Sequence, residues 1–177
     1  MLASEIEEVF NEQKSSKSLE LILKTNLAIL HFVNKNYSKA LKELHEILIE
    51  EKNNFAIDQY NFIKIFQLIV HFEKGNTDIL PYIIKSVYRH LLQGKKLYKV
   101  ENALLEFLKV KLYKIKTQRD LTEAFKSLKA ELEVICMNPQ EETFMEIFDV
   151  ISWLQSKIEK RPLEEILMEK SGYFIEK

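Results

Sequence analysis

The stretch Leu30–Leu44, LHFVNKNYSKALKEL, decides the fold, because a related stretch, VHFEKGNTDILPYI, begins 40 residues later at Val70. Each contains an apolar residue, His, Phe, three further residues and Asn. In the first stretch, the apolar residues after Asn36 recur at helical spacing, as Ala40, Leu41 and Leu44. This pattern predicts that one helix ends, a short turn follows and a second helix begins.

The predicted helices alternate in how many of their faces are apolar. Residues 37–50 carry one apolar stripe, whereas residues 19–33 and 55–72 carry apolar side chains on two faces. A third pair is expected over 98–115 and 121–137. In stacked helix pairs, an inner helix is buried on two sides and an outer helix on one. We therefore predict an all-α fold, a right-handed α-solenoid of about three and a half antiparallel helix pairs.

The predicted start of each second helix supports this phasing. Asn36, Asp78 and Asp120 are 42 residues apart and are expected to be N-caps. Asn138 and Pro139 are expected to start one continuous helix that runs to Lys160. The whole chain, 1–177, is predicted to form a single helical-repeat domain. Its parts are a leading helix and linker over 1–17, helix pairs over 18–53, 54–95 and 96–138, and a terminal pair and cap over 139–177.

Composition agrees with a helical protein. Only three Gly and three Pro occur among 177 residues, and 46% of the residues are hydrophobic. Strand-rich and α/β proteins normally need more Gly and Pro at their turns. The single cysteine, Cys136, cannot form an intramolecular disulfide. The acidic N-terminus does not resemble a secretory signal, and no apolar stretch reaches the length of a membrane span, so a cytoplasmic protein is expected.

The segment NYSKALKEL, with Tyr37, Ala40 and Leu41, resembles the second half of a tetratricopeptide repeat. The period of 40 to 42 residues is longer than in that family and lies in the range of HEAT and armadillo repeats. The stretches ENALLEFLKVKL and FDVISWLQSKIEKRPLEEIL also resemble the C-terminal region of bacterial helical-repeat proteins of no known activity. These resemblances imply a tetratricopeptide-like fold and a chain that could be a piece of a longer protein.

No residue pattern predicts catalysis. The four His residues include no pair at i, i+4 spacing, and the three Gly residues stand apart from one another. Adjacent carboxylates, such as Glu50 and Glu51, point in different directions on a helix. We therefore expect no enzyme activity, no cofactor and no metal.

Charge is unevenly distributed along the chain. Residues 85–119 hold ten Lys or Arg against two Glu, which gives +8, with Tyr88, Tyr98 and Tyr113 between them. Three interpretations remain open: an ordinary solvated surface, a site for an acidic peptide or protein, and a nucleic-acid contact made mainly to phosphates. The basic patch comprises Lys85, Arg89, Lys95, Lys96, Lys99, Lys109, Lys114, Lys116 and Arg119, together with Lys111.

The sequence thus predicts a non-enzymatic protein–protein interaction scaffold that binds a partner segment in a groove lined by the inner helices. Polar residues one repeat apart would form ladders along that groove. An alternative is that they only solvate the free edge of each inner helix. A second hypothesis is nucleic-acid binding through 85–119, and a third is that an uncapped apolar end pairs with another copy. The ladder residues are Lys24, His31, Lys64, His71 and Lys111.

Overall fold

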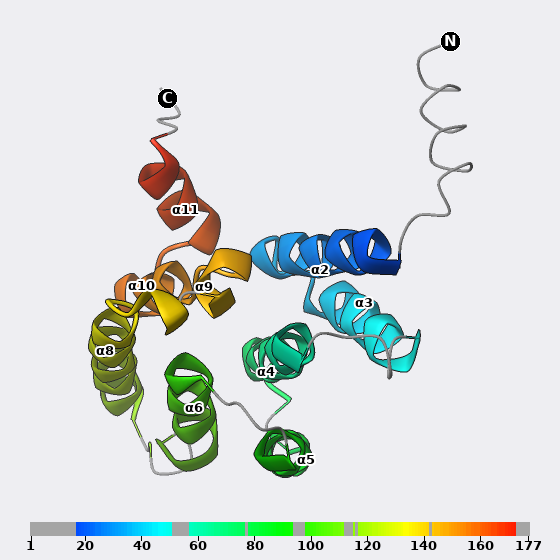
Figure 1. Cartoon of the computed structure of the whole chain (residues 1–177). Helices are drawn as coiled ribbons and strands as arrows, with labels where there is room; N and C mark the ends of the chain where they lie inside the picture. Colours follow the sequence, from blue (N-terminus) through cyan, green and yellow to red (C-terminus); the bar gives the residue numbers. More distant parts are fainter. Residues whose placement is uncertain are drawn as a thin grey trace. The chain divides into compact units, whose positions relative to one another are not determined.

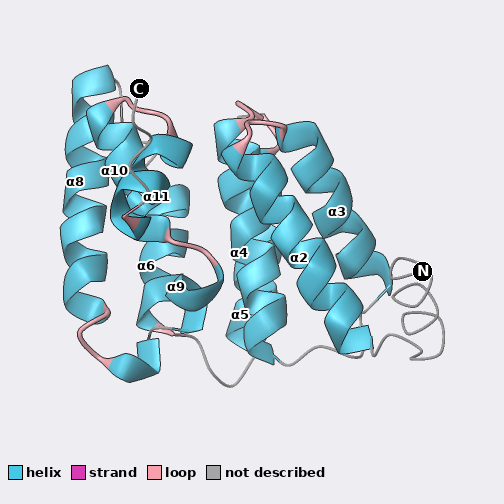
Figure 2. Cartoon of the chain, turned by 90° about the horizontal axis from the view of Figure 1, so that it is seen from above, coloured by secondary structure: helices cyan, strands magenta, loops and turns pink. Residues whose placement is uncertain are grey.

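The computed structural model describes residues 17–50, 57–76, 78–93, 98–111, 115, 117–141 and 143–172. Within these ranges the chain forms helices and connecting turns, and no strand (Figure 2). This confirms the all-α prediction for the described residues. The chain divides into two compact units, residues 1–53 and 54–177, and each is described by itself.

The first unit contains α2 (Lys17–Val33) and α3 (Tyr37–Glu50), which pack against each other as a hairpin (Figure 1). Ala28 of α2 and Ala40 of α3 are fully buried, and side chains this small let the two backbones approach closely. Only one apolar face of α2 is buried, so the prediction that this helix is buried on two sides is wrong. The other face is exposed at Leu19, Ile22, Leu23, Leu27 and Leu30.

The turn between paired helices has the same geometry in each unit. After α2, Lys35 adopts a left-handed conformation, and the Asn36 N–H donates to the carbonyl of His31 at 2.8 Å. After α4 (Ile57–Glu73), Gly75 is left-handed and the Asn76 N–H donates to the carbonyl of His71 at 3.1 Å. This is the Schellman motif, which satisfies carbonyls at a helix C-terminus. The repeated His-Phe…Asn pattern is therefore a helix-ending motif.

The second unit is built around α4, whose apolar side chains are buried on more than one face, as predicted. Seven of them are at most 2% exposed: Phe62, Ile63, Ile65, Phe66, Leu68, Ile69 and Val70. A helix that is apolar nearly all round must be surrounded by other elements. Its partner α5 (Leu80–Gln93) begins two residues after Asp78, so Asp78 is not directly at the N-cap position.

The third pair consists of α6 (Lys99–Glu106), a π-helical turn η1 (Phe107–Lys111) and α8 (Gln118–Ile135). Phe107 packs on Phe125 with ring centroids 5.4 Å apart, which joins η1 to α8. The N-cap of α8 is Thr117, whose hydroxyl accepts the N–H of Asp120 at 3.1 Å. The prediction that Asp120 is the N-cap is therefore wrong by three residues, because the sequence Thr-x-x-Asp offers two candidate caps.

The terminal region differs from the predicted continuous helix over 139–160. It consists of a 3-10 turn η2 (Pro139–Glu141), α9 (Thr143–Ile147), α10 (Val150–Glu159) and α11 (Leu163–Ser171). The break before α10 lies at Asp149, whose carboxylate accepts the N–H of Ser152 at 2.9 Å. An Asp side chain that bonds nearby backbone favours a helix start over a helix interior. Residues 1–16 of the predicted leader and 173–177 of the predicted cap lie outside the described residues.

Candidate functional site

A groove between α5 and η1 is a candidate site in the second unit. It encloses a volume of about 480 Å³, within the range of pockets that bind small molecules or side chains. The residues from α5 are spaced three or four apart and so share one face of that helix, while η1 contributes a lysine from the adjacent element. The groove is lined by Pro81, Ile84, Lys85, Tyr88, Arg89 and Lys109.

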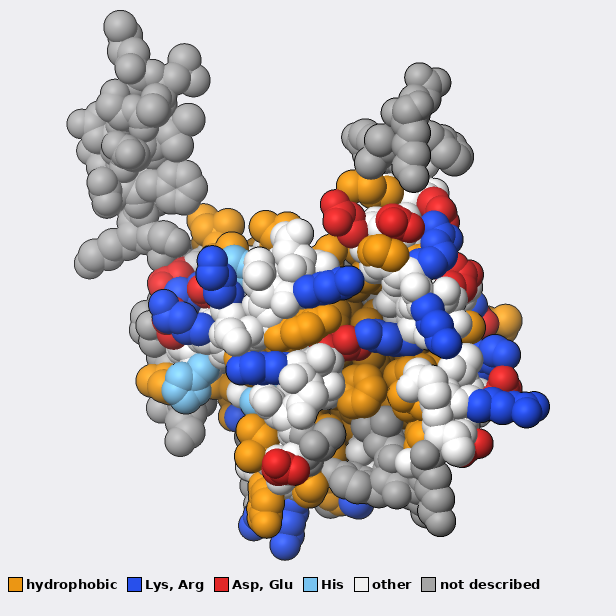
Figure 3. All heavy atoms as spheres, turned by 180° about the vertical axis from the view of Figure 1, so that it is seen from behind, with side chains coloured by type: hydrophobic (Ala, Val, Ile, Leu, Met, Phe, Trp, Pro, Cys, Tyr) orange, Lys and Arg blue, Asp and Glu red, His pale blue; other side chains and the backbone are white. Residues whose placement is uncertain are grey.

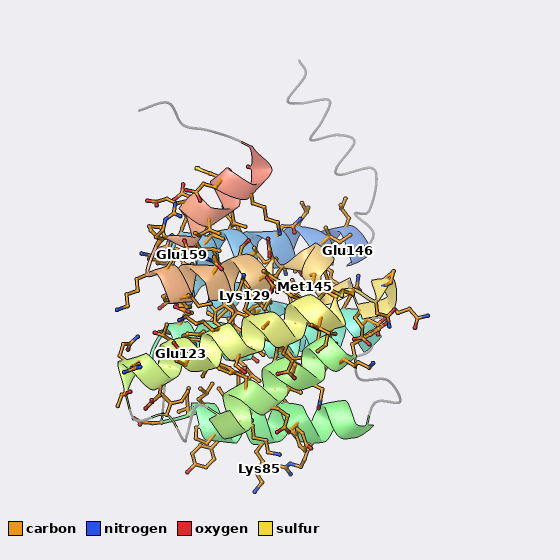
Figure 4. All side chains as sticks on the ribbon, turned by 90° about the vertical axis from the view of Figure 1, so that its left-hand side faces the viewer. Lys85, Glu123, Lys129, Met145, Glu146 and Glu159 are labelled. Carbon is orange, nitrogen blue, oxygen red and sulfur yellow. The ribbon has the colours of Figure 1, made fainter. Side chains whose placement is uncertain are left out.

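The floor of the groove is apolar and its rim is cationic. Ile84 is 2% exposed, and Tyr88 is half-buried beside it. The Lys109 ammonium lies 3.8 Å from the centroid of the Tyr88 ring, a cation–π contact that orients both side chains. Lys85 extends outward from α5 (Figure 4). Arg89 is also exposed, and its Nε donates to the backbone carbonyl of Lys85 at 3.5 Å.

The three cations of the groove are not neutralised by a described neighbour. Among the described residues, no Asp or Glu forms an ion pair with Lys85, Arg89 or Lys109. Elsewhere ion pairs do form, as between Lys129 and Glu133 at 2.9 Å on α8. The groove therefore carries a local excess of positive charge above an apolar surface.

Of the other residues in the predicted basic patch, the two with described side chains, Lys99 and Arg119, do not line this groove. Lys99 begins α6, and ten residues of helix between Lys99 and Lys109 correspond to roughly 15 Å. Arg119 lies in the first turn of α8 and is exposed. On the face seen in Figure 3, Lys and Arg side chains are interspersed with Asp and Glu. The side chains of Lys95, Lys96, Lys111, Lys114 and Lys116 lie outside the described part of the chain.

The described residues of the predicted ladder differ in burial and in the groups that they contact. In the first unit, Lys24 pairs with Glu20 at 3.1 Å within α2, and His31 is half-buried. In the second unit, the Lys64 ammonium lies 5.4 Å from the centroid of the Tyr60 ring.

His71 is buried at 9% exposure, and the Asn76 amide Nδ2 lies 2.9 Å from its Nδ1. Burial, together with the charge of Lys74, lowers the pKa of His71, which favours the neutral imidazole. In this position His71 stabilises the turn after α4 through its contact with Asn76.

A second polar cluster, which the sequence pattern did not reveal, lies at the start of α6. A Glu101 carboxylate oxygen accepts the backbone N–H of Tyr98 at 3.0 Å and the side-chain amide of Asn61 at 3.4 Å. The Tyr98 hydroxyl donates to Asp58 of α4 at 3.1 Å. Burial raises the pKa of Glu101 to about 7, and the nearby carboxylates of Asp58 and Glu141 contribute to this increase.

Glu141 of η2 caps α6 from a distant part of the sequence. Its carboxylate accepts the backbone N–H of Lys99 at 2.6 Å and that of Val100 at 3.4 Å. The first N–H groups of a helix have no intrahelical acceptor, and a carboxylate there also interacts favourably with the helix dipole. The only signal in the sequence is a separation of 42 residues between Lys99 and Glu141, close to the repeat period. We regard this cluster as structural, because Asn61, Glu101 and Glu141 are buried and their polar atoms are hydrogen-bonded within the fold.

Within the described ranges, no group of three or more His, Cys, Asp or Glu side chains is placed to hold a metal ion. None of the described helices combines the length and apolarity needed to cross a bilayer. No known protein-family model matches this chain, and neither a curated protein nor a solved structure matches it.

Proposed function

We propose that this chain is a cytoplasmic, non-enzymatic protein–protein interaction scaffold, and that a partner segment binds in the groove between α5 and η1. The observation that carries the proposal is the pairing of an apolar floor, Ile84 and Tyr88, with three cations that have no described carboxylate partner. Protein interfaces combine a buried apolar or aromatic centre with a polar rim in this way. The proposal moves the binding surface from the predicted inner-helix ladder to this groove.

The proposed architecture is a tetratricopeptide-like, right-handed α-solenoid of about three and a half helix pairs. Support comes from side-chain bonds at the repeat separation within the second unit. Asn61 bonds Glu101 and Tyr98 bonds Asp58, and each pair is 40 residues apart. In a stacked array each repeat contacts its neighbour, so contacts at one period are expected. The matching turns after α2 and α4 are a second, local sign of repetition.

Nucleic-acid binding through residues 85–119 is the second candidate, favoured by the exposure of Lys85, Arg89 and Lys109. Single-stranded nucleic acid is usually held by bases stacked on aromatic rings above a basic track. Here the Lys109 ammonium already covers one face of the Tyr88 ring. Lys99, another described cation of the patch, is ten residues from Lys109, roughly 15 Å along the helix, and does not line the groove. We therefore rank this candidate below a protein partner.

A selection from a random-sequence peptide library on the immobilised chain tests the proposal. The test variant is Tyr88→Ala, and the control is Tyr82→Ala, which lies on the same helix, is 76% exposed and does not line the groove. Selected peptides should bind Tyr88→Ala at least about tenfold more weakly, the loss typical of a central aromatic side chain, and Tyr82→Ala nearly as well as the parent.

Circular dichroism must show that both variants keep their helices. If no selected peptide depends on Tyr88, the groove is not a binding site and the proposal fails. Anisotropy titrations with single-stranded RNA and DNA at two salt concentrations test the second candidate, which requires binding that weakens steeply with salt.

A further inference from the structure

The charges around the groove define what kind of segment fits it. Lys85 and Arg89 are one helical turn apart on α5, roughly 6 Å along the helix axis, and Lys109 comes from η1. The cations therefore come from two elements, α5 and η1, around an apolar floor that α5 provides. A ligand that fills the groove must bring apolar surface to its centre and negative charge to both sides.

We propose that the occupant is an acidic segment of a partner protein, which places one apolar side chain on Ile84 and Tyr88 and its carboxylates on Lys85, Arg89 and Lys109. This inference rests on the function proposed above and specifies the chemistry of the partner. It assigns the groove to peptides in which acidic residues flank a single aliphatic or aromatic residue.

A ligand that covers the three cations of the groove must replace the water that hydrates them. A neutral or basic segment would displace water from Lys85, Arg89 and Lys109 without giving them a partner, and burying an unpaired charge is costly. An acidic segment replaces the lost hydration with charge-assisted hydrogen bonds. Among the described contacts, Arg89 uses only its Nε, so its terminal nitrogens are available to a carboxylate in a bidentate arrangement.

Lys109 is held ready for such a partner. Its contact with Tyr88 fixes the ammonium beside the groove, so less side-chain entropy is lost when a carboxylate binds. The ring and the ammonium then act together, with the ring contacting the apolar side chain and the ammonium contacting the acid. A phosphate backbone would use the cations but would leave the apolar floor of Ile84 without a complement.

The test uses two synthetic fluorescent peptides, one with a leucine between two pairs of acidic residues and one with each acid replaced by its amide. The acidic peptide should bind the parent chain at least about tenfold more tightly than the amide peptide. The double variant Lys85→Glu, Lys109→Glu reverses two rim charges and should lose this preference. It should instead bind more tightly a third peptide in which basic residues replace the acidic ones. The control variant is Arg119→Glu, which reverses the charge of an exposed residue on α8 and should leave the preference for the acidic peptide unchanged.

The outcomes separate this inference from the proposed function. Equal binding of the acidic and amide peptides, with binding that still depends on Tyr88, overturns the acidic partner and leaves the interaction groove intact. Loss of all Tyr88-dependent binding overturns both. Binding of single-stranded RNA or DNA that requires Lys85 and Lys109 but is unaffected by Tyr88→Ala overturns the protein partner in favour of nucleic acid. If the charge-reversed variant binds the basic peptide more tightly than the parent chain does, the inference is supported, because an unfolded variant would not acquire new binding.

Discussion

The side-chain amide of Asn61 on α4 donates a hydrogen bond of 3.4 Å to Glu101 on α6, a residue 40 positions later. Both side chains are buried, at 3% and 2% exposure. No buried side-chain nitrogen or oxygen in the described part of the chain lacks a hydrogen-bond partner. The contact therefore joins two helices of the second unit through a satisfied polar pair inside an apolar core.

The raised pKa of Glu101 makes stability depend on pH. Its usual value is 4.5 and its value in the fold is about 7, so between these values the folded protein keeps a proton that the unfolded chain has lost. Stability contributed by this group is therefore lost as pH rises from about 4.5 to about 7. Glu101→Gln should raise the free energy of unfolding by roughly 3 kcal/mol at pH 8 and by under about 1 kcal/mol at pH 5.

Urea unfolding of both proteins at the two pH values measures this difference. Glu123→Gln, at an exposed position of α8, is the control and should show no comparable dependence (Figure 4). An equal effect of Glu101→Gln at pH 5 and pH 8 would contradict the account.

The cap that Glu141 provides to α6 predicts a local effect. Glu141→Ala leaves the N–H groups of Lys99 and Val100 without the acceptor and should cost about 1–3 kcal/mol. Glu141→Gln keeps an acceptor oxygen and should cost less. Amide hydrogen exchange is the direct measurement: the first turn of α6 should exchange faster in the alanine variant, while the amides of α3 should be unchanged. Uniform acceleration would point to global destabilisation instead.

Lys35 and Gly75, the left-handed residues in the turns after α2 and α4, should respond to substitution in opposite directions. Lys35 has φ +59°, where a side chain is strained, so Lys35→Gly should stabilise the first unit by up to about 1 kcal/mol. Gly75 has φ +76° and open space where a Cβ would lie, so Gly75→Ala should cost about 1 kcal/mol through the backbone alone. Gly75→Asn should cost less than Gly75→Ala, because Asn tolerates this conformation. Thermal unfolding, monitored by circular dichroism, measures the change in stability of each of the three variants.

The contact between Trp153 and Glu73 offers an optical readout. The indole N–H of Trp153 on α10 donates a hydrogen bond of 2.8 Å to the Glu73 carboxylate on α4, and Lys157 forms an ion pair with the same carboxylate. Glu73→Leu removes the acceptor for both groups and should cost about 2 kcal/mol or more. Because Trp153 is the only tryptophan, its fluorescence should change in Glu73→Leu. Glu73→Gln, which keeps an acceptor for the indole, should give a smaller change.

Some of the site was predictable from charge alone. The excess of Lys and Arg over residues 85–119 includes Lys85, Arg89 and Lys109, but it did not separate these three from Lys99 and Arg119. The separation depends on η1 packing beside α5, which brings Lys109 onto the ring of Tyr88. A count of charges along the chain contains no information about that packing.

The amino-acid sequence by itself determined the all-α character of the described residues and the helix-ending motif at His31–Asn36 and His71–Asn76, because both depend on hydrogen bonds and side-chain periodicity within a few residues. It did not reveal the breaks within 139–160. Only the tertiary structure decided that Glu141 caps α6, that Asn61 meets Glu101 and that three cations surround one apolar floor. These relationships join residues between 20 and 42 positions apart, and their geometry follows from how whole helices pack.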